Sequence, residues 1–273
     1  MRQLLALLIV LSLAGCSFNP ERKTQQLCPA CEAVRLATST RMPVLGYRQN
    51  VSTSADNPFL HVYLEGDGQP WLHGRWPASN PSSREMTALQ LMLLDSTPSL
   101  YLNRPCYGLR QMPENCLSTL WTDGRYSAEV VATLATALEE LGQKYRDKRL
   151  VLIGHSGGGT LAMLLAPRLE KVAAVVTLAA NLDHRAWTDA HGYLPLTRSL
   201  NPAEQPLLSE GILRWHLAGG KDLQVPAEIT EKAASRDPAA RFILHPDFDH
   251  TCCWQQIWPD LLQTLQDQLT GTK

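Results

Sequence analysis

Residues 149–165 read RLVLIGHSGGGTLAMLL and carry the clearest signal of the chain's architecture. The stretch opens with a short apolar run, Arg149–Ile153, which is typical of a strand buried on both faces of a sheet. A glycine-rich turn, GHSGGG at residues 154–159, follows directly, and apolar residues at helical spacing continue from Thr160 to Leu169. A buried strand that turns straight into a helix indicates an alternating α/β fold.

The rest of the chain repeats this alternation. We expect further strands at residues 59–64 (FLHVYL), 99–103, 172–178 (VAAVVTL), 213–217 and 241–244. We expect helices at residues 84–94, 127–145, 228–234 and 254–269. This order predicts a mostly parallel sheet covered by helices on both faces, with the functional crevice at the carboxyl ends of the strands.

The composition fits one soluble domain. The 273 residues are 44% hydrophobic and 19% charged, which excludes a disordered, collagen-like or coiled-coil chain. The length would admit two domains, but α/β folds often reach about 250 residues as one. The 25 Lys and Arg residues balance 26 Asp and Glu residues without a basic run, so we expect no nucleic-acid partner.

The N-terminus indicates export. Met1-Arg2 is followed by an apolar stretch, Leu4 to Leu13, which is too short for a membrane span of about 20 residues and is typical of a signal peptide. The stretch ends in LAGC at residues 13–16, which is similar to the lipobox of bacterial lipoproteins. Small residues also precede ordinary cleavage sites, so a signal peptide followed by a chance cysteine is the alternative.

The lipobox resemblance implies that Cys16 becomes the lipidated N-terminus. Ser17 implies sorting to the outer membrane, facing the periplasm. Two or three acyl chains anchor a protein stably without a basic patch. The predicted organisation is a signal peptide at residues 1–15, a lipidated cysteine and polar tether at 16–27, and one α/β domain at 28–273.

The cysteine content fits that compartment. With Cys16 set aside, six of the seven cysteines remain, an even number that favours disulfides in an oxidising space. Cys106 and Cys116 flank a turn-rich loop and form the expected pair. The other pairings stay open among Cys28, Cys31, Cys252 and Cys253. A zinc site built from these four is the less favoured alternative, and we expect no metal.

Ser156 stands at the centre of the glycine-rich turn, in the pattern GxSxG. A serine hydroxyl is a weak nucleophile unless it is held at a sharp strand-to-helix turn, where flanking glycines avoid clashes and the helix N-terminus adds positive potential. Strand, turn and helix all occur here in that order. A phosphate-binding turn is the alternative, but neither a GK[ST] nor a GxGxxG pattern fits these residues. The pattern favours Ser156 as a nucleophile.

From Phe59 to the C-terminus the chain resembles the α/β-hydrolase family, and the order of its polar residues carries the resemblance. That family places its catalytic residues in the order serine, acid, histidine. After Ser156, the strand at 213–217 leads into AGGKD, which looks like the family's acid turn and ends at Asp222. His250 follows the last strand and precedes the terminal helix.

The resemblance implies an α/β-hydrolase fold with a three-residue catalytic site. Neutral His250 would take the proton of Ser156 and later deliver one to the leaving group, while Asp222 would fix the imidazole tautomer. Asp183, which follows the strand at 172–178, is the alternative acid, since some members of the family carry the acid one strand earlier.

Other polar residues are expected in structural roles. Asp247 and Asp249 lie too close in sequence to the candidate base to orient it easily. His61 and His216 lie inside predicted strands, and His155 belongs to the glycine-rich turn, where we expect it to pack.

Two backbone N–H groups are expected to hold the oxyanion. The resemblance implies Gly157, next to the nucleophile, and Asp67 in the loop EGDG at residues 65–68. The family commonly has His-Gly at this turn, whereas here an acid stands at the donor position. A carboxylate would oppose the developing negative charge, so the Asp67 side chain must face away or be neutralised, for example by Arg104 or Arg125.

Two short segments are expected to wall the site. The first is Gln69–Ser83 with Trp71 and Trp76, and the second is a minimal lid at about residues 184–206, which contains Trp187. Aromatic walls with few charges suit an uncharged, medium-sized acyl or aryl group. These tryptophans can equally serve only to pack the loops.

We therefore expect a serine hydrolase that cleaves a carboxylic ester or related acyl bond of a small-molecule substrate through an acyl-enzyme, without metal or organic cofactor. A serine aminopeptidase-like amidase is the alternative enzyme, and it would need acidic groups such as Glu65 and Asp67 for a free amine. The alternative outside enzymes is an envelope protein that keeps the fold as a binding scaffold. The sequence leaves the oligomeric state open.

Overall fold

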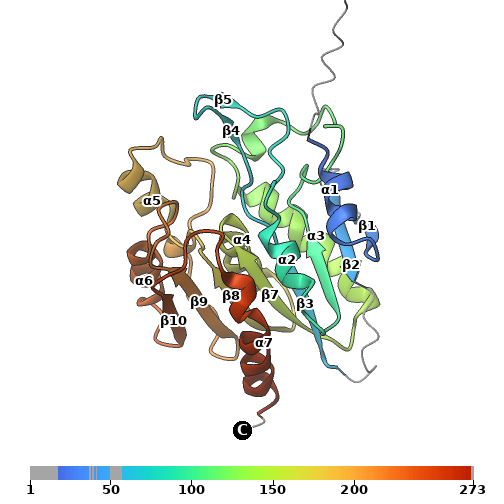
Figure 1. The fold of residues 1–273 in the computed structure, drawn as a ribbon, viewed down its shortest axis with the longest axis vertical. Helices are drawn as coiled ribbons and strands as arrows, with labels where there is room; N and C mark the ends of the chain where they lie inside the picture. The colour runs from blue at the N-terminus through green and yellow to red at the C-terminus, as the bar shows by residue number, and fades with distance from the viewer. Residues whose placement is uncertain (1–17, 37, 39, 41, 50–56, 272–273) are drawn as a thin grey trace, which may run out of the picture.

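The computed structural model describes residues 18–36, 38, 40, 42–49 and 57–271. The predicted signal peptide and Cys16 lie outside these residues. The described chain is built around one eight-stranded sheet, with helices on either side of it (Figure 1). The fold is an α/β-hydrolase fold, which confirms the prediction from the alternation of strands and helices.

The main sheet is parallel except at one edge. In spatial order its strands are β1 (Glu32–Leu36), β2 (Val44–Gln49), β6 (Ser99–Leu102), β3 (Phe59–Leu64), β7 (Arg149–His155), β8 (Val172–Leu178), β9 (Leu213–Gly219) and β10 (Ala240–His245). Strand β2 runs antiparallel to both β1 and β6, and the other neighbouring pairs are parallel. A separate hairpin joins β4 (Trp71–Leu72) to β5 (Trp76–Pro77).

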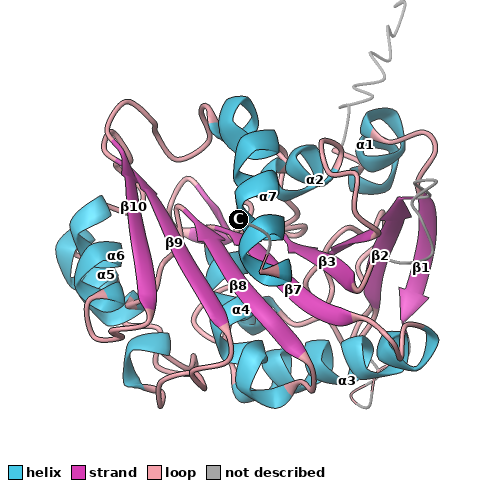
Figure 2. Ribbon diagram, turned by 90° about the horizontal axis from the view of Figure 1, so that it is seen from below, coloured by secondary structure: helices cyan, strands magenta, loops and turns pink. Residues whose placement is uncertain are grey.

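Helices cover both faces of the sheet (Figure 2). The α-helices are α1 (Pro20–Leu27), α2 (Thr87–Met92), α3 (Ala128–Lys144), α4 (Gly157–Leu165), α5 (His184–His191), α6 (Ala227–Ala234) and α7 (Trp254–Thr270). Short 3-10 turns lie at Ser118–Leu120, Ala166–Arg168 and Pro202–Glu204. Helices α3 and α4 pack on one face of the sheet, and α2 and α7 pack on the other.

The pleat of the central strands divides the core into two layers. In β7, Leu150 and Leu152 join the cluster under α3 and α4, whereas Val151 and Ile153 join the cluster under α2 and α7. Because both faces are covered, β7 has no solvent-facing row of side chains and reads as a continuous apolar run.

The predicted elements mostly recur in the structure. The strands expected at 59–64 and 172–178 have those bounds, and Ser127 caps α3 by accepting the Val130 N–H. The sequence reading missed β1 and β2, since β1 is an exposed edge strand and β2 contains Gly46.

The segment expected as a tether, residues 16–27, includes a helix in the structure. Residues 20–27 form α1, which begins with Pro20 after the capping side chain of Asn19. Thr24 of this helix is buried against Met86, and Phe18 packs on the layer under α2 and α7. The polar composition of residues 20–27 did not indicate a helix, because only a few of the side chains of α1 face the core.

The sheet gathers the loops of interest at one edge. The segments that follow β3, β7, β9 and β10 all leave from the carboxyl ends of parallel strands, so they meet on the same side. In the described part of the chain, none of the helices has the length and apolarity needed to cross a membrane.

The two-layered core makes a stability prediction. Replacing buried Leu152 in the central strand by Ala removes contacts that neighbouring strands cannot restore, and we expect the free energy of unfolding to fall by about 2–5 kcal/mol. The same change at Leu244, which is half exposed on edge strand β10, should cost less than about 1 kcal/mol. Urea denaturation followed by circular dichroism measures both, and equal losses would contradict this account of the core.

Candidate active site

Ser156 sits in a strained turn between β7 and α4. Its backbone has φ 53° and ψ −126°, a conformation that a non-glycine residue rarely adopts, and its N–H donates to the Leu178 carbonyl over 2.9 Å. The turn requires glycine at position 158, because a Cβ on Gly158 would stand 2.1 Å from the Leu64 carbonyl oxygen. The close packing of α4 on the end of β3 therefore explains the glycines after Ser156.

Asp222 and His250 are in contact. The imidazole Nδ1 of His250 lies 2.8 Å from Asp222 Oδ2, and the Asp222 side chain is fully buried. The other carboxylate oxygen accepts the N–H groups of Gln224 and Val225, each over 2.8 Å. An ionised carboxylate in this setting makes Nδ1 the donor and leaves Nε2 of a neutral His250 able to accept a proton.

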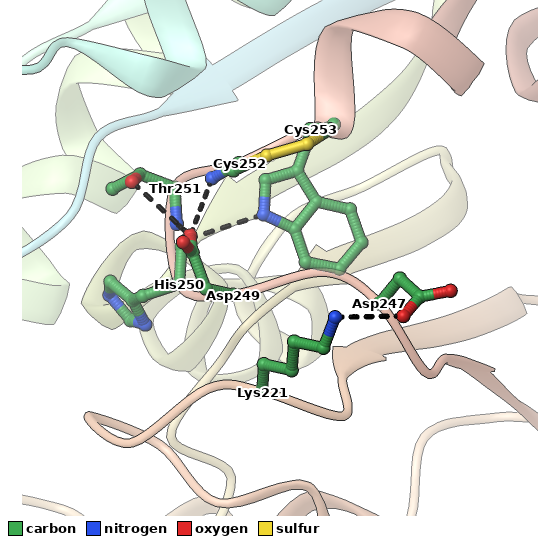
Figure 3. The surroundings of a disulfide bond; sticks show 8 residues. Lys221, Asp247, Asp249, His250, Thr251, Cys252 and Cys253 are labelled. Carbon is green, nitrogen blue, oxygen red and sulfur yellow. Dashed lines mark hydrogen bonds and ion pairs between the residues drawn. A yellow bond between two sulfur atoms is a disulfide. The ribbon is translucent and has the colours of Figure 1, made fainter.

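Several groups fix the loop that carries His250. The backbone carbonyl of His250 accepts hydrogen bonds from His155 Nε2 over 2.7 Å and from Trp254 Nε1 over 3.2 Å. Asp249, the residue before His250, accepts the N–H groups of Thr251 and Cys252 at its Oδ1 (Figure 3). Hydrogen bonds therefore fix the backbone at His250 and directly after it.

His155 has a more specific role than packing. Its Nε2 must donate, because its partner is a carbonyl oxygen, so its proton resides on that nitrogen. Burial and the nearby charge of His250 lower the pKa of His155 to about 3, which keeps the ring neutral at physiological pH. The sequence reading missed this contact, and the position of His155 directly before Ser156 is the signal that points to it.

Asp67 is neutralised by two arginines, as the sequence requires of a carboxylate at this position. Its carboxylate bonds to the guanidinium of Arg104, to Arg125 Nη1 over 2.9 Å and to the Tyr126 hydroxyl over 2.7 Å. The Tyr107 hydroxyl donates to its backbone carbonyl over 3.2 Å. Burial alone would raise the pKa of Asp67, but the charges of Arg104 and Arg125 outweigh it and hold the pKa at about 2.

The two expected oxyanion donors are neighbours. A Cβ placed on Gly157 would stand 2.0 Å from Asp67 Oδ1, so the Asp67 side chain packs directly on the Gly157 backbone. Two buried guanidinium groups, of Arg104 and Arg125, face this one carboxylate. The cluster therefore carries a net positive charge, which stabilises a negative charge that develops nearby.

Glu65 is enclosed and unavailable to a ligand. Its carboxylate is buried, accepts the Gly66 N–H over 3.0 Å and accepts the Tyr101 hydroxyl over 3.2 Å. Burial raises the pKa of Glu65 above its ordinary value. With Asp67 bound to its arginines, neither acid presents a carboxylate for the free amine of an aminopeptidase substrate.

The alternative acids take other roles. Asp183 caps α5, accepting the N–H groups of Arg185 and Ala186, and it also accepts the Asn201 side chain over 2.8 Å. Asp247 forms an exposed ion pair with Lys221 over 2.8 Å (Figure 3). The structure thus places Asp222, and not Asp183, against His250.

The strand histidines are structural, in agreement with the sequence reading. His61 Nδ1 lies 2.6 Å from Asp95, and His216 Nδ1 lies 2.9 Å from the Thr177 hydroxyl. Burial lowers the pKa of His216 to about 4. In the described chain, no three or more His, Cys, Asp or Glu side chains gather closely enough to hold a metal ion.

Ser156 and His250 line one pocket of about 1190 Å³ at the carboxyl edge of the sheet. Asp67 lies in the same pocket, the segment after β3 contributes Trp71, and the expected lid segment contributes Trp187. The lid consists of α5 and the loop that follows it. Its Trp187 indole donates to the Gln224 carbonyl over 2.6 Å, so the lid is tied to the loop of the candidate acid.

The six described cysteines form three local disulfides. Cys106 pairs with Cys116, the pair that the sequence favours. The pairs left open are resolved as Cys28–Cys31 and Cys252–Cys253. The last pair follows His250 in the loop shown in Figure 3, where its S–S bond is drawn in yellow.

The family model described as the alpha/beta hydrolase family matches residues 59–271 of this chain. The chain therefore belongs to the alpha/beta hydrolase family, and this membership supports a hydrolase. The comparison with curated protein sequences gave no match.

Solved structures agree on the fold. An esterase from Pyrococcus furiosus is similar, with a TM-score of 0.62 at 14% identity over 90% of this chain and 93% of that one. An alpha-beta serine hydrolase homologue from Coxiella burnetii has a TM-score of 0.55 at 16% identity over 87% and 97%. Alpha/beta hydrolase domain-containing protein 10 from mouse has a TM-score of 0.57 at 17% identity over 89% and 100%.

The Asp67 cluster makes a prediction about stability. In Asp67→Asn, the buried guanidinium groups of Arg104 and Arg125 lose their counter-ion, and we expect the free energy of unfolding at pH 7 to fall by about 3–5 kcal/mol. In the matched control, Asp247→Asn, only an exposed ion pair is lost, and the expected change is below about 1 kcal/mol. Urea denaturation of both variants distinguishes the cluster from a surface pair.

The same cluster predicts a pH dependence. The pKa of Asp67 lies at about 2 in the folded protein, below its ordinary 3.8, so its ionised form adds stability that is complete above about pH 4 and is lost as the pH falls toward 2. Over this range the wild type should lose about 2 kcal/mol more than Asp67→Asn. Parallel denaturation curves for the two proteins from pH 5 to pH 2 would argue against an ionised Asp67.

Proposed function

We propose that this protein is a serine hydrolase that cleaves a carboxylic ester through an acyl-enzyme on Ser156. The observation that carries the proposal is the hydrogen bond between Asp222 and His250, because His250 lines the same pocket as Ser156, which lies at a strained strand-to-helix turn. These are the parts of a nucleophile, a general base and a group that orients the base.

In the acylation step, Ser156 Oγ attacks the ester carbonyl carbon and its proton passes to Nε2 of His250. The resulting oxyanion is held by the backbone N–H groups of Gly157 and Asp67. The C–O bond to the alcohol then breaks, the imidazolium returns its proton to the departing oxygen, and the alcohol leaves. Asp222 stabilises the imidazolium while it exists.

Deacylation repeats the sequence with water. Water gives a proton to Nε2 of His250 and attacks the acyl carbon of the ester on Ser156. Collapse of the second tetrahedral intermediate breaks the bond to Oγ, which takes back the proton. The free acid is released and the enzyme returns to its starting state. No cofactor takes part in these steps.

The acidic groups favour an ester over an aminoacyl substrate. An aminopeptidase-like enzyme needs a free carboxylate for the substrate's amine, but Glu65 is enclosed and Asp67 is bound to two arginines. The remaining pocket walls include Trp71 and Trp187, which suit an acyl or aryl group. The same walls carry charged side chains, namely Arg75, Arg84, Glu85, Asp123 and Arg198.

We further propose that the protein works in the bacterial cell envelope, anchored by acyl chains on Cys16 at the outer membrane and facing the periplasm. The lipobox-like LAGC at residues 13–16 supports this placement. The three disulfides among the described cysteines also support it, since disulfides persist in oxidising compartments.

The proposal predicts which acid matters. Replacing Ser156 by Ala should lower kcat/KM for an ester by about 10⁴-fold or more, and Asp222→Asn should lower it by about 10³- to 10⁴-fold because the imidazole loses its fixed tautomer. The matched control, Asp183→Asn, should leave kcat/KM unchanged, because Asp183 caps α5. A larger loss in Asp183→Asn than in Asp222→Asn would overturn the assignment.

The substrate class is tested with a panel. Initial rates are measured on p-nitrophenyl esters of increasing chain length and on aminoacyl anilides, with Ser156→Ala as the control. We expect ester turnover that the variant lacks. Anilide turnover would favour the amidase, and failure of both substrates together with failure of a phosphonate probe to label Ser156 would favour a binding scaffold.

A further inference from the structure

Exposed apolar side chains gather around the mouth of the pocket. On one side, hairpin β4–β5 presents Leu72, 48% exposed, and Trp76, 65% exposed. On the other side, Leu194 and Leu223 are each 86% exposed. We call six side chains the apolar rim: Trp71, Leu72, Trp76, Tyr193, Leu194 and Leu223. Trp71, Tyr193 and Leu194 line the pocket itself, and the other three lie one to five residues from lining residues.

The lid half of the rim is one connected surface. The Tyr193 ring lies 5.2 Å from the Trp187 ring and 5.0 Å from the His191 ring, centroid to centroid. His191 Nε2 lies 3.1 Å from the Leu223 carbonyl oxygen, with which it can form a hydrogen bond. These contacts join the lid to the loop after β9. Leu194 and Leu223 are exposed on these two joined segments.

The rim carries no negative charge of its own. Residues 68–84, which include the hairpin, contain no Asp or Glu and contain Arg75 and Arg84, both of which line the pocket, while the next residue, Glu85, is exposed and lines it as well. Residues 190–203 likewise contain no Asp or Glu. Exposed tryptophans beside arginines are typical of segments that lie in the interface between lipid headgroups and acyl chains.

The N-terminal end of the described chain lies on the same side. The Phe18 ring packs under the Arg84 guanidinium, 4.9 Å from its carbon to the ring centroid, and Arg84 lines the pocket. The described chain therefore begins on the pocket side of the molecule. Cys16 precedes Phe18 by two residues, which span at most about 7 Å of chain. Figure 1 draws the hairpin and the start of α1 toward the same end.

We propose that the apolar rim docks on the surface of a lipid bilayer, so that the pocket opens toward the membrane and takes an acyl ester of a membrane lipid as its substrate. The proposal rests on the hydrolase function of Ser156 and names its substrate class. A second copy of this chain would cover the same side chains, but face-to-face pairing would close both pockets. A bilayer covers the rim and delivers an acyl chain along it.

The docking is measured without catalysis. The full chain is bound to vesicles of phosphatidylcholine and phosphatidylglycerol whose acyl chains carry bromine, which quenches nearby tryptophan. Trp121, Trp215, Trp254 and Trp258 are buried and Trp187 is half-buried, so most of the quenching should come from the two exposed tryptophans of the hairpin. The variant Trp71→Phe/Trp76→Phe should lose most of the quenching seen in the wild type. An unchanged quenched fraction would overturn the docking.

The substrate class is measured with a matched pair of variants. The ratio of hydrolysis of p-nitrophenyl palmitate in vesicles to that of p-nitrophenyl butyrate in water should fall about tenfold in Leu72→Glu, which adds a charge at the bilayer. Leu94→Glu makes the same change at a residue that is 44% exposed and lies before β6, at the opposite edge of the sheet. Its ratio should equal that of the wild type.

The outcomes separate the two proposals. Equal ratios in Leu72→Glu and Leu94→Glu, with butyrate hydrolysed normally, would overturn the lipid substrate and leave the hydrolase intact. No hydrolysis of either ester by the wild type would overturn the hydrolase, while the quenching still reports on docking. A dimer in sedimentation that Leu72→Glu dissociates, without quenching by brominated lipid, would assign the rim to a second copy and overturn the proposal.

Discussion

The close approach between the first turn of α4 and the end of β3 sets the geometry of the whole site. Gly158 brings backbone against the Leu64 carbonyl, where a Cβ would not fit, and this contact fixes Ser156 in its strained conformation. It also brings Gly157 against the Asp67 side chain. One packing contact between a helix and a strand therefore positions both the proposed nucleophile and the backbone groups proposed to stabilise the oxyanion.

The charges around this contact are balanced by buried partners. An acid directly beside an oxyanion site would oppose catalysis, yet here Arg104 and Arg125 reverse the local charge while the Tyr126 hydroxyl completes the set. On the opposite side of the pocket, neutral His155 holds the backbone of His250. Buried hydrogen bonds therefore fix both the loop that carries Asp67 and the loop that carries His250.

The sequence predicts those features that depend on local pattern or chain order. Buried parallel strands such as 59–64 appear as apolar runs, and the order of Ser156, Asp222 and His250 follows the family resemblance. It does not predict β1, β2 or α1, which are short, partly exposed and lack a strong period. The sequence also does not predict contacts such as that between His155 and His250, because these contacts join residues that are distant in the chain through the packing of separate strands and loops.

The disulfides of the described chain are all local in sequence. Their cysteines are separated by 3, 10 and 1 residues, so each bond closes a short loop and none joins two strands of the main sheet. Closing so short a loop removes little freedom from an unfolded chain. In the described chain the strand order therefore rests on noncovalent packing, and the sheet can form before any of these thiols is oxidised.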